Sequence, residues 1–186
     1  MALSTGINKI KTAVFISGSG SNLLSLIKFS KLKKSPISIN IIITNNSKSK
    51  GLIYAKQFRV KKKIYNFKVR KFAEKKILLE LKKNKIDLIC LAGFMKILSK
   101  NFIYNFKGKI LNIHPSLLPK FKGLNTHERA LKNKEKFSGC TVHYVNSKLD
   151  SGEVILQKKV KIVKGETLKT LRDKILRQEH KLYPEA

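Results

Sequence analysis

The sequence predicts an α/β protein with a doubly wound, mostly parallel sheet and an antiparallel edge near its C-terminal end. Short apolar runs alternate along the chain with stretches whose apolar residues recur at helical spacing, which is the pattern of βα units. Residues 86–91 (IDLICL) are almost all apolar, as in a central parallel strand that is covered on both faces. Residues 140–145 and 153–163 are extended runs separated by a short polar loop, which indicates an antiparallel hairpin. Four βα units imply right-handed crossovers between the parallel strands.

The individual elements follow from local patterns. The helix at residues 70–84 is the best defined, because its apolar residues recur on one face. The expected strands are at residues 12–17, 37–43, 63–67, 86–91 and 109–114. The expected helices are one after the first strand, three at 51–60, 70–84 and 99–106, one that is capped by Asn125 or Thr126 and leads to Leu131, and a last one at 167–182.

Composition is that of a globular protein. The chain has 186 residues, of which 42% are hydrophobic, and it is long enough to bury a core without disulfides or metal. No apolar run reaches the length of a membrane span, and residues 1–11 lack the apolar block of a signal peptide. We expect a cytoplasmic protein. Residues 1–186 are predicted to form a single domain, because no repeat, linker or low-complexity block divides the chain.

The cysteines and histidines do not have the spacing of a metal site. Cys90 and Cys140 both lie inside apolar, strand-like runs without a C-x-x-C pattern. Buried free thiols are therefore expected, with neither a disulfide nor a bound metal.

The formal net charge of +30 could indicate a nucleic-acid partner. The lysines, however, are spread along every segment, and no basic motif interleaved with aromatic residues is present. Two explanations stay open: an AT-rich genome that places lysine on solvated faces, or a field that attracts anionic ligands. We expect no specific nucleic-acid partner.

The loop after the first strand has the composition of a phosphate site. In GSGSN, residues 18–22, Gly18 and Gly20 allow close backbone approach, and Ser21 or Asn22 can cap the following helix or donate to an anion. Backbone N–H groups at a helix N-terminus bind phosphate. The third glycine of a dinucleotide fingerprint is missing and no Gly-Lys-Ser/Thr follows, so a small phosphorylated ligand fits best. A plain βα turn is the structural alternative.

Two further segments carry candidate site residues. In the strand at 109–114, Asn112 and His114 point to the same face, and Pro115 ends the strand where open parallel sheets place their ligand crevice. A structural histidine at a strand end is the alternative. The apolar loop at 92–98 (AGFMKIL) either lines a flat aromatic pocket or packs back onto the core.

Six segments together resemble the phosphoribosylglycinamide formyltransferase family of purine biosynthesis, in order and over nearly the whole chain. They are ISGSGSNL, LAGFMKILS, LNIHPSLLPKFKGLNTH, GCTVHYV, LDSGEVILQ and QEHKLYP. The resemblance implies a Rossmann-like formyltransferase fold. It also implies transfer of the formyl group of 10-formyltetrahydrofolate to the amine of glycinamide ribonucleotide, with these two small molecules as partners, no metal, no membrane, and a monomer or homodimer.

The resemblance also assigns residues by position. Asn112, His114 and Asp150 match the catalytic Asn, His and Asp of the family. The positions that match substrate contacts are Gly20, Ser21 and Asn22 at the ribonucleotide phosphate, and Glu179. The positions that match the folate site are Arg70, Met95, Lys96, Ile97, Leu98, Asn112, Asn146, Ser147, Lys148, Leu149 and Asp150.

Two departures from the family pattern stand out. Ser19 occupies a position where the family has Asn, a mild change because the loop works through its backbone. The chain ends at Ala186, whereas the family runs on for some tens of residues. We expect the lack of this C-terminal tail to leave apolar surface open and to lower the melting temperature.

Three alternatives remain at this point. Methionyl-tRNA formyltransferase resembles this chain but is expected to need an additional C-terminal domain, and formyltetrahydrofolate deformylase an extra N-terminal one. A basic nucleic-acid-binding α/β protein is the alternative from another class, and binding that weakens steeply with salt and ignores sequence would reveal charge alone.

Overall fold

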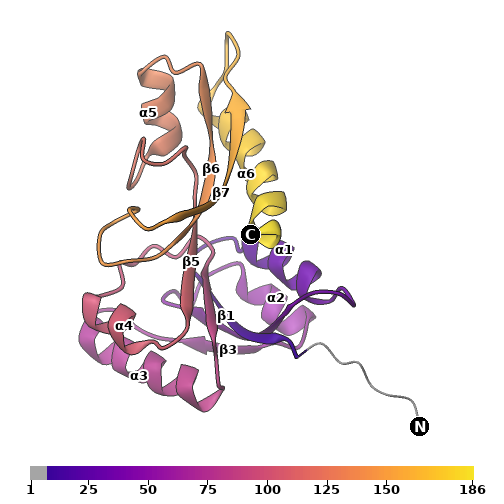
Figure 1. Ribbon diagram of the computed structural model, residues 1–186, viewed down its shortest axis with the longest axis vertical. Helices are drawn as coiled ribbons and strands as arrows, with labels where there is room; N and C mark the ends of the chain where they lie inside the picture. The colour runs from indigo at the N-terminus through magenta and orange to yellow at the C-terminus, as the bar shows by residue number, and fades with distance from the viewer. Residues whose placement is uncertain (1–7) are drawn as a thin grey trace.

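The computed structural model describes residues 8–186 and has one seven-stranded sheet, in the order β3-β2-β1-β4-β5-β6-β7 (Figure 1). Residues 1–7, part of the segment expected to lack a signal peptide, lie outside the described residues. The strands are β1 (Ile10–Ile16), β2 (Ile37–Thr44), β3 (Lys61–Ile64), β4 (Leu88–Leu91), β5 (Lys109–His114), β6 (Phe137–Tyr144) and β7 (Val154–Lys161). The first five strands are parallel to one another, and β6 runs antiparallel to both β5 and β7. The predicted fold class is confirmed.

Helices cover both faces of the sheet. They are α1 (Ser21–Ser30), α2 (Leu52–Gln57), α3 (Arg70–Lys83), α4 (Lys100–Asn105), α5 (Thr126–Lys132) and α6 (Leu168–Glu185). One buried cluster joins the sheet to α1, α2 and α6, and a second joins the other face to α3 and α4. Helix α5 packs beside α6 and β6. The result is three layers, which is the doubly wound arrangement.

Most elements lie where the sequence predicts them, with two clear differences. The strand predicted at residues 63–67 is β3 at Lys61–Ile64, where pairing with β2 sets its position and all four residues are exposed. Lysines on such an edge strand discourage pairing with another chain. The helix predicted at 51–60 is only Leu52–Gln57, because Arg59 has a positive φ of 54° and the chain turns into β3 there.

The loops that follow β1 and β2 make a close backbone contact. Gly20 has a φ of 75°, and a Cβ placed on it would lie 2.6 Å from the Gly51 Cα atom. The Gly51 N–H donates to the Gly18 carbonyl oxygen at 3.0 Å. Only glycine allows the two backbones to approach this closely.

Both cysteines are buried and free, as predicted. Burial is the main cause that raises the pKa of Cys90 and of Cys140 to about 12, so neither thiol is a reactive nucleophile at neutral pH.

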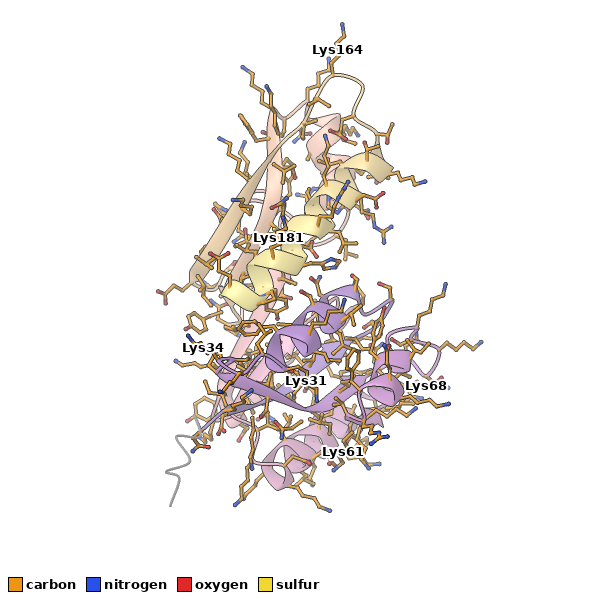
Figure 2. All side chains as sticks on the ribbon, turned by 90° about the vertical axis from the view of Figure 1, so that its right-hand side faces the viewer. Lys31, Lys34, Lys61, Lys68, Lys164 and Lys181 are labelled. Atoms are coloured by element: carbon orange, nitrogen blue, oxygen red, sulfur yellow. The ribbon has the colours of Figure 1, made fainter. Side chains whose placement is uncertain are left out.

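The lysines do not gather on one face. Figure 2 shows them pointing outward from both ends of the molecule, from Lys164 at one end to Lys61 at the other. Such a distribution is expected of solvated faces. Among the helices of residues 8–186, none combines the length and the apolar character needed to cross a bilayer.

Candidate active site at the carboxyl edge of the sheet

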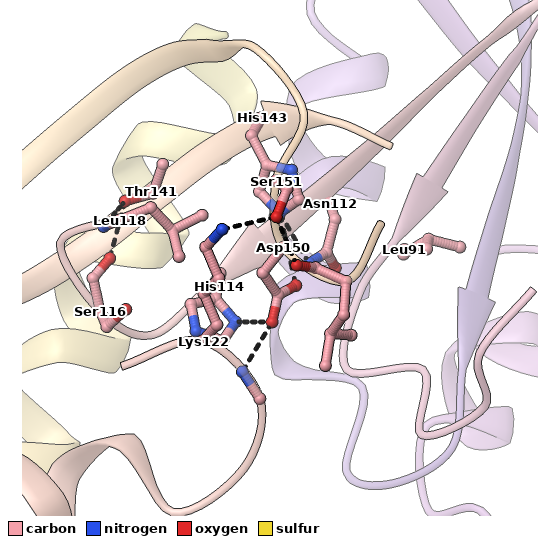
Figure 3. Close-up of polar contacts among 12 residues, drawn as sticks. Leu91, Asn112, His114, Ser116, Leu118, Lys122, Thr141, His143, Asp150 and Ser151 are labelled. Atoms are coloured by element: carbon pink, nitrogen blue, oxygen red, sulfur yellow. Dashed lines mark hydrogen bonds and ion pairs between the residues drawn. The ribbon is translucent and has the colours of Figure 1, made fainter. Parts of the chain in front are cut away.

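Asn112 and His114 point to the same face at the end of β5, as the alternation in the sequence predicts. Their neighbours of opposite parity, Leu111 and Ile113, pack into the core beneath α1 and α6. Asp150 comes from the loop between β6 and β7 and reaches His114, with its Oδ2 atom 3.4 Å from His114 Nδ1 (Figure 3). The structure thus brings Asp150, from a later loop, to the two neighbouring polar residues of β5.

The His114 ring is held from both of its nitrogen atoms. Nε2 lies 2.9 Å from the Phe121 carbonyl oxygen, which can only accept, so Nε2 carries a hydrogen. Nδ1 faces the Asp150 carboxyl group. These two contacts fix the orientation of the ring, with its Nδ1 edge toward Asp150.

Asp150 is itself fixed by the backbone. Its Oδ2 atom accepts from the Gly123 N–H at 2.8 Å, and its side chain is only 8% exposed. Lys122 reaches across the same two loops, with its Nζ atom 2.5 Å from the Ser151 Oγ atom. The loop after β5 and the loop after β6 are therefore fastened to each other over the site.

A second histidine, His143 on β6, belongs to the cluster and was not predicted from the sequence. Its Nε2 atom lies 3.1 Å from Asn112 Nδ2 and 3.7 Å from Asp150 Oδ1 (Figure 3). Burial is the largest influence on this ring and lowers its pKa, as does the charge of His114, whereas the Tyr144 carbonyl and Asp150 act in the opposite direction. The sequence does contain a signal for His143, because a histidine interrupts the otherwise mostly apolar run GCTVHYV.

The loop that follows β5 is held by a buried polar network. Thr141 Oγ1 donates to the Ser116 carbonyl oxygen at 2.7 Å and accepts from the Leu118 N–H at 3.1 Å. Gln157 Nε2 donates to the Leu118 carbonyl oxygen and to Thr141 Oγ1. This network places Phe121 and Gly123 where they contact His114 and Asp150.

The glycine loop leads directly into α1, as predicted. Gly20 occupies the N-cap position and no side chain caps the helix, so the first of the two roles expected for Ser21 and Asn22, capping, is wrong. The second role, donation to an anion, stays a prediction. The left-handed conformation of Gly20 takes the place of a side-chain cap, and Leu24 is the first helix residue whose N–H is bonded, to the Gly20 carbonyl oxygen. The backbone N–H groups in the first turn of α1, before Leu24, have no partner within the helix and are available to an anion.

Asn22 pairs instead with Glu179 on α6. Asn22 Nδ2 donates to Glu179 Oε2 at 2.6 Å, and both residues are buried. Burial raises the pKa of Glu179 to about 7, although the Asn22 hydrogen bond and the charge of Arg172 act in the opposite direction. The Asn22 Oδ1 atom is buried without a hydrogen-bond partner among the described residues. This end of the site therefore contains a buried amide oxygen that is available to accept a hydrogen bond from a ligand.

The residues that the sequence relates to the folate site surround the same edge of the sheet. In the loop after β4, Met95 and Ile97 are 66% and 65% exposed, whereas Leu98 is buried. Phe94 packs edge-on against Phe15 and Phe67, so part of this loop does pack back onto the core. The other positions are exposed: Arg70 at the start of α3, Lys96 in the loop after β4, and Asn146, Ser147, Lys148 and Leu149 in the loop after β6.

No group of three or more His, Cys, Asp or Glu side chains within residues 8–186 is arranged to hold a metal ion. The fold and the cluster together define the class: a doubly wound α/β protein whose amide, imidazole and carboxyl groups meet beyond the strand ends, where ligands bind in such sheets.

Comparison with known proteins identifies the family. The Formyl transferase family profile matches residues 10–186. The phosphoribosylglycinamide formyltransferase of Haemophilus influenzae is 40% identical over 177 residues, which cover 94% of this chain and 84% of that protein. The chain belongs to the formyl transferase family, and within it to the phosphoribosylglycinamide formyltransferases.

Other relatives agree with this assignment. The trifunctional purine biosynthetic protein adenosine-3 of Homo sapiens is 43% identical over 181 residues, but the chain spans only 18% of its length. The crystal structure of phosphoribosylglycinamide formyltransferase from Anaplasma phagocytophilum has a TM-score of 0.90 and 40% identity, covering 96% of this chain and 84% of that one. The corresponding structure from Brucella melitensis has a TM-score of 0.90 and 39% identity, covering 95% and 93%.

Proposed function

We propose that this protein transfers the formyl group of 10-formyltetrahydrofolate to the amine of 5'-phosphoribosylglycinamide, a step of purine biosynthesis. The observation that carries the proposal is the convergence of Asn112, His114 and Asp150 at the end of β5. Family membership supports it independently, because the related proteins carry the name of this activity. Residues 1–186 are proposed to form one formyltransferase domain.

The reaction requires stabilisation of negative charge on oxygen. The substrate amine attacks the formyl carbon, a C–N bond forms, and the formyl oxygen becomes an oxyanion. Asn112 is suited to donate to that oxygen, because one N–H of its amide faces His143 and the other has no acceptor within residues 8–186. One well-placed donor of this kind contributes about 3 kcal/mol to the transition state.

His114 and Asp150 act together in the same step. Because His114 Nε2 is engaged by Phe121, the ring acts through its Nδ1 edge, which faces Asp150. Asp150, directly or through water, accepts the proton that the attacking amine loses. That proton passes to the departing folate nitrogen as the original C–N bond breaks, so the transfer is balanced without a further reactant.

The two substrates approach from different sides of this cluster. The ribonucleotide phosphate binds at Gly20, Ser21 and Asn22, where the first N–H groups of α1 are available. Glu179 contacts the same substrate from α6. The folate lies against the exposed apolar side chains of the loop after β4, with the remaining contacts from Arg70, Met95, Lys96, Ile97, Leu98, Asn146, Ser147, Lys148 and Leu149.

The proposed partners are these two small molecules, without a specific nucleic acid, in a cytoplasmic monomer or homodimer. Formylation is tested by mixing the purified protein with both substrates and following the absorbance change that accompanies loss of the formyl group from folate. Formyl loss that does not depend on the ribonucleotide would indicate a deformylase instead.

Variants locate the chemistry. Asn112→Ala and His114→Ala are each expected to lower kcat by about 100-fold to 1,000-fold, with much smaller changes in KM, because both residues act mainly in the transition state. Lys164→Ala, in an exposed turn far from the site, is the control (Figure 2). Parental turnover in His114→Ala would contradict the proposed mechanism.

A further inference from the structure

We propose that His143 is a positioning residue that sets the orientation of the Asn112 amide, so that an N–H group, and not the carbonyl oxygen, is presented to the formyl oxygen. The proposal rests on the proposed function for its catalytic meaning. It assigns a role to a residue that neither motif spacing nor the three-residue cluster requires.

The hydrogen bonds of His143 determine which nitrogen is protonated. Its Nδ1 atom lies 2.8 Å from the Tyr144 carbonyl oxygen, and a carbonyl oxygen only accepts, so Nδ1 carries a hydrogen. In the neutral ring the other nitrogen, Nε2, is then an acceptor. Asn112 Nδ2 lies 3.1 Å from Nε2 and is the donor to it.

The opposite orientation of the amide is penalised. If the Asn112 side chain were rotated by half a turn, its oxygen would face the Nε2 lone pair and neither atom could donate. A buried polar group without a hydrogen-bond partner is destabilising. The present orientation instead uses one amide N–H for His143 and leaves the second for the substrate.

The backbone makes this contact difficult to replace. Asn112 and His143 are direct partners in the antiparallel register of β5 and β6, so their side chains project to the same face. His143 is only 2% exposed, which leaves water little room to act as the acceptor. The register between β6 and β7 also shifts between Val142 and His143, which marks an irregularity in the strand at this point.

Charged groups surround the ring without displacing this arrangement. Asp150 approaches from the loop after β6, with Oδ1 3.7 Å from Nε2, and His114 approaches from β5. A positively charged His143 would turn Nε2 into a donor and lose the Asn112 contact. Burial, the dominant influence on His143, favours the neutral ring that accepts from Asn112.

Two substitutions at His143 distinguish the contact of Nε2 with Asn112 from the contact of Nδ1 with Tyr144. The side-chain amide of Gln reaches the position of Nε2, so His143→Gln keeps an acceptor for Asn112. The shorter side chain of Asn reaches only the position of Nδ1, so His143→Asn keeps the donor to Tyr144 and loses that acceptor. We expect kcat to fall about 10-fold to 100-fold in His143→Asn and less than about fivefold in His143→Gln, with KM for both substrates nearly unchanged.

A matched control excludes a general disturbance of β6. Val142 is fully buried on the opposite face, and Val142→Ala should lower the melting temperature while kcat stays within about twofold of the parent. Equal kcat losses in the Gln and Asn variants would overturn the proposal, as would a loss that appears only in KM.

A double-mutant cycle tests whether His143 acts through Asn112. In an Asn112→Ala background, His143→Asn should have almost no further effect on kcat. A full, independent loss in that background would overturn the proposal.

Nitrogen NMR of the parent provides a readout that needs no activity: the Nδ1–H form of His143 is expected, and the Nε2–H form would refute the orientation. Absence of formyl transfer would count against the proposed function alone, and NMR would still decide the orientation.

Discussion

Glu179 makes the stability of this protein depend on pH in a direction opposite to that of an ordinary paired carboxylate. Its pKa is raised to about 7 by burial, from an ordinary value of 4.5. Below pH 4.5 the group is protonated in the folded and unfolded states alike, and its stabilising contribution is complete. Between 4.5 and 7 the unfolded chain releases the proton first, so the free energy of unfolding decreases as pH rises. Above pH 7 the loss is complete and amounts to about 3 kcal/mol.

Glu179→Gln removes this dependence while keeping the shape of the side chain and an oxygen that accepts from Asn22. We expect the variant to be more stable than the parent by less than about 1 kcal/mol at pH 5 and by about 3 kcal/mol at pH 8. Urea unfolding followed by far-ultraviolet circular dichroism at pH 5, 6, 7 and 8, without substrates, measures the difference. Comparison with the parent cancels the contributions of the histidines. A variant that is no more stable than the parent at pH 8 would refute the reasoning.

Three further predictions concern the site and its support. Asp150→Ala should lower kcat by at least about 100-fold with a smaller change in KM, measured by the folate absorbance assay. Gly20→Ala should cost at least about 2 kcal/mol in urea unfolding, because φ is positive and the new Cβ would meet Gly51 at 2.6 Å, whereas Gly18→Ala, with no atom within 4 Å, should be nearly neutral. Tyr183→Phe removes the buried hydroxyl that bonds two strand carbonyls and should lower the melting temperature by about 3–6 °C; an unchanged melting temperature would show that these bonds contribute nothing.

The order of the elements was predictable because each depends on neighbours in the sequence. Alternation placed Asn112 and His114 on one face of a strand, and the glycine loop was recognisable from its residue types alone. The predicted bounds of the exposed strand β3 differ from the observed ones because its lysines carry no apolar pattern. Only pairing with β2 determines where this strand begins and ends. Local signals identify elements that bury a face, and they are weak for an edge strand.

Other features depend on contacts between distant segments. Asn22 and Glu179 are 157 positions apart, and nothing near either residue indicates that they share a buried hydrogen bond. The raised pKa of Glu179 follows from that burial. The close approach of Gly20 to Gly51 also depends on a contact between distant segments. Because of it, the packing requires glycine at position 20.

The sequence by itself determined the fold class, the strand that ends in Asn112 and His114, and the family resemblance, because periodicity and motif spacing are properties of short segments. The tertiary structure decided that Asp150 meets His114 and that His143 lies opposite Asn112. Hydrogen-bond partners, tautomers and pKa values depend on which groups exclude water from one another, and that depends on how strands from different parts of the chain pair.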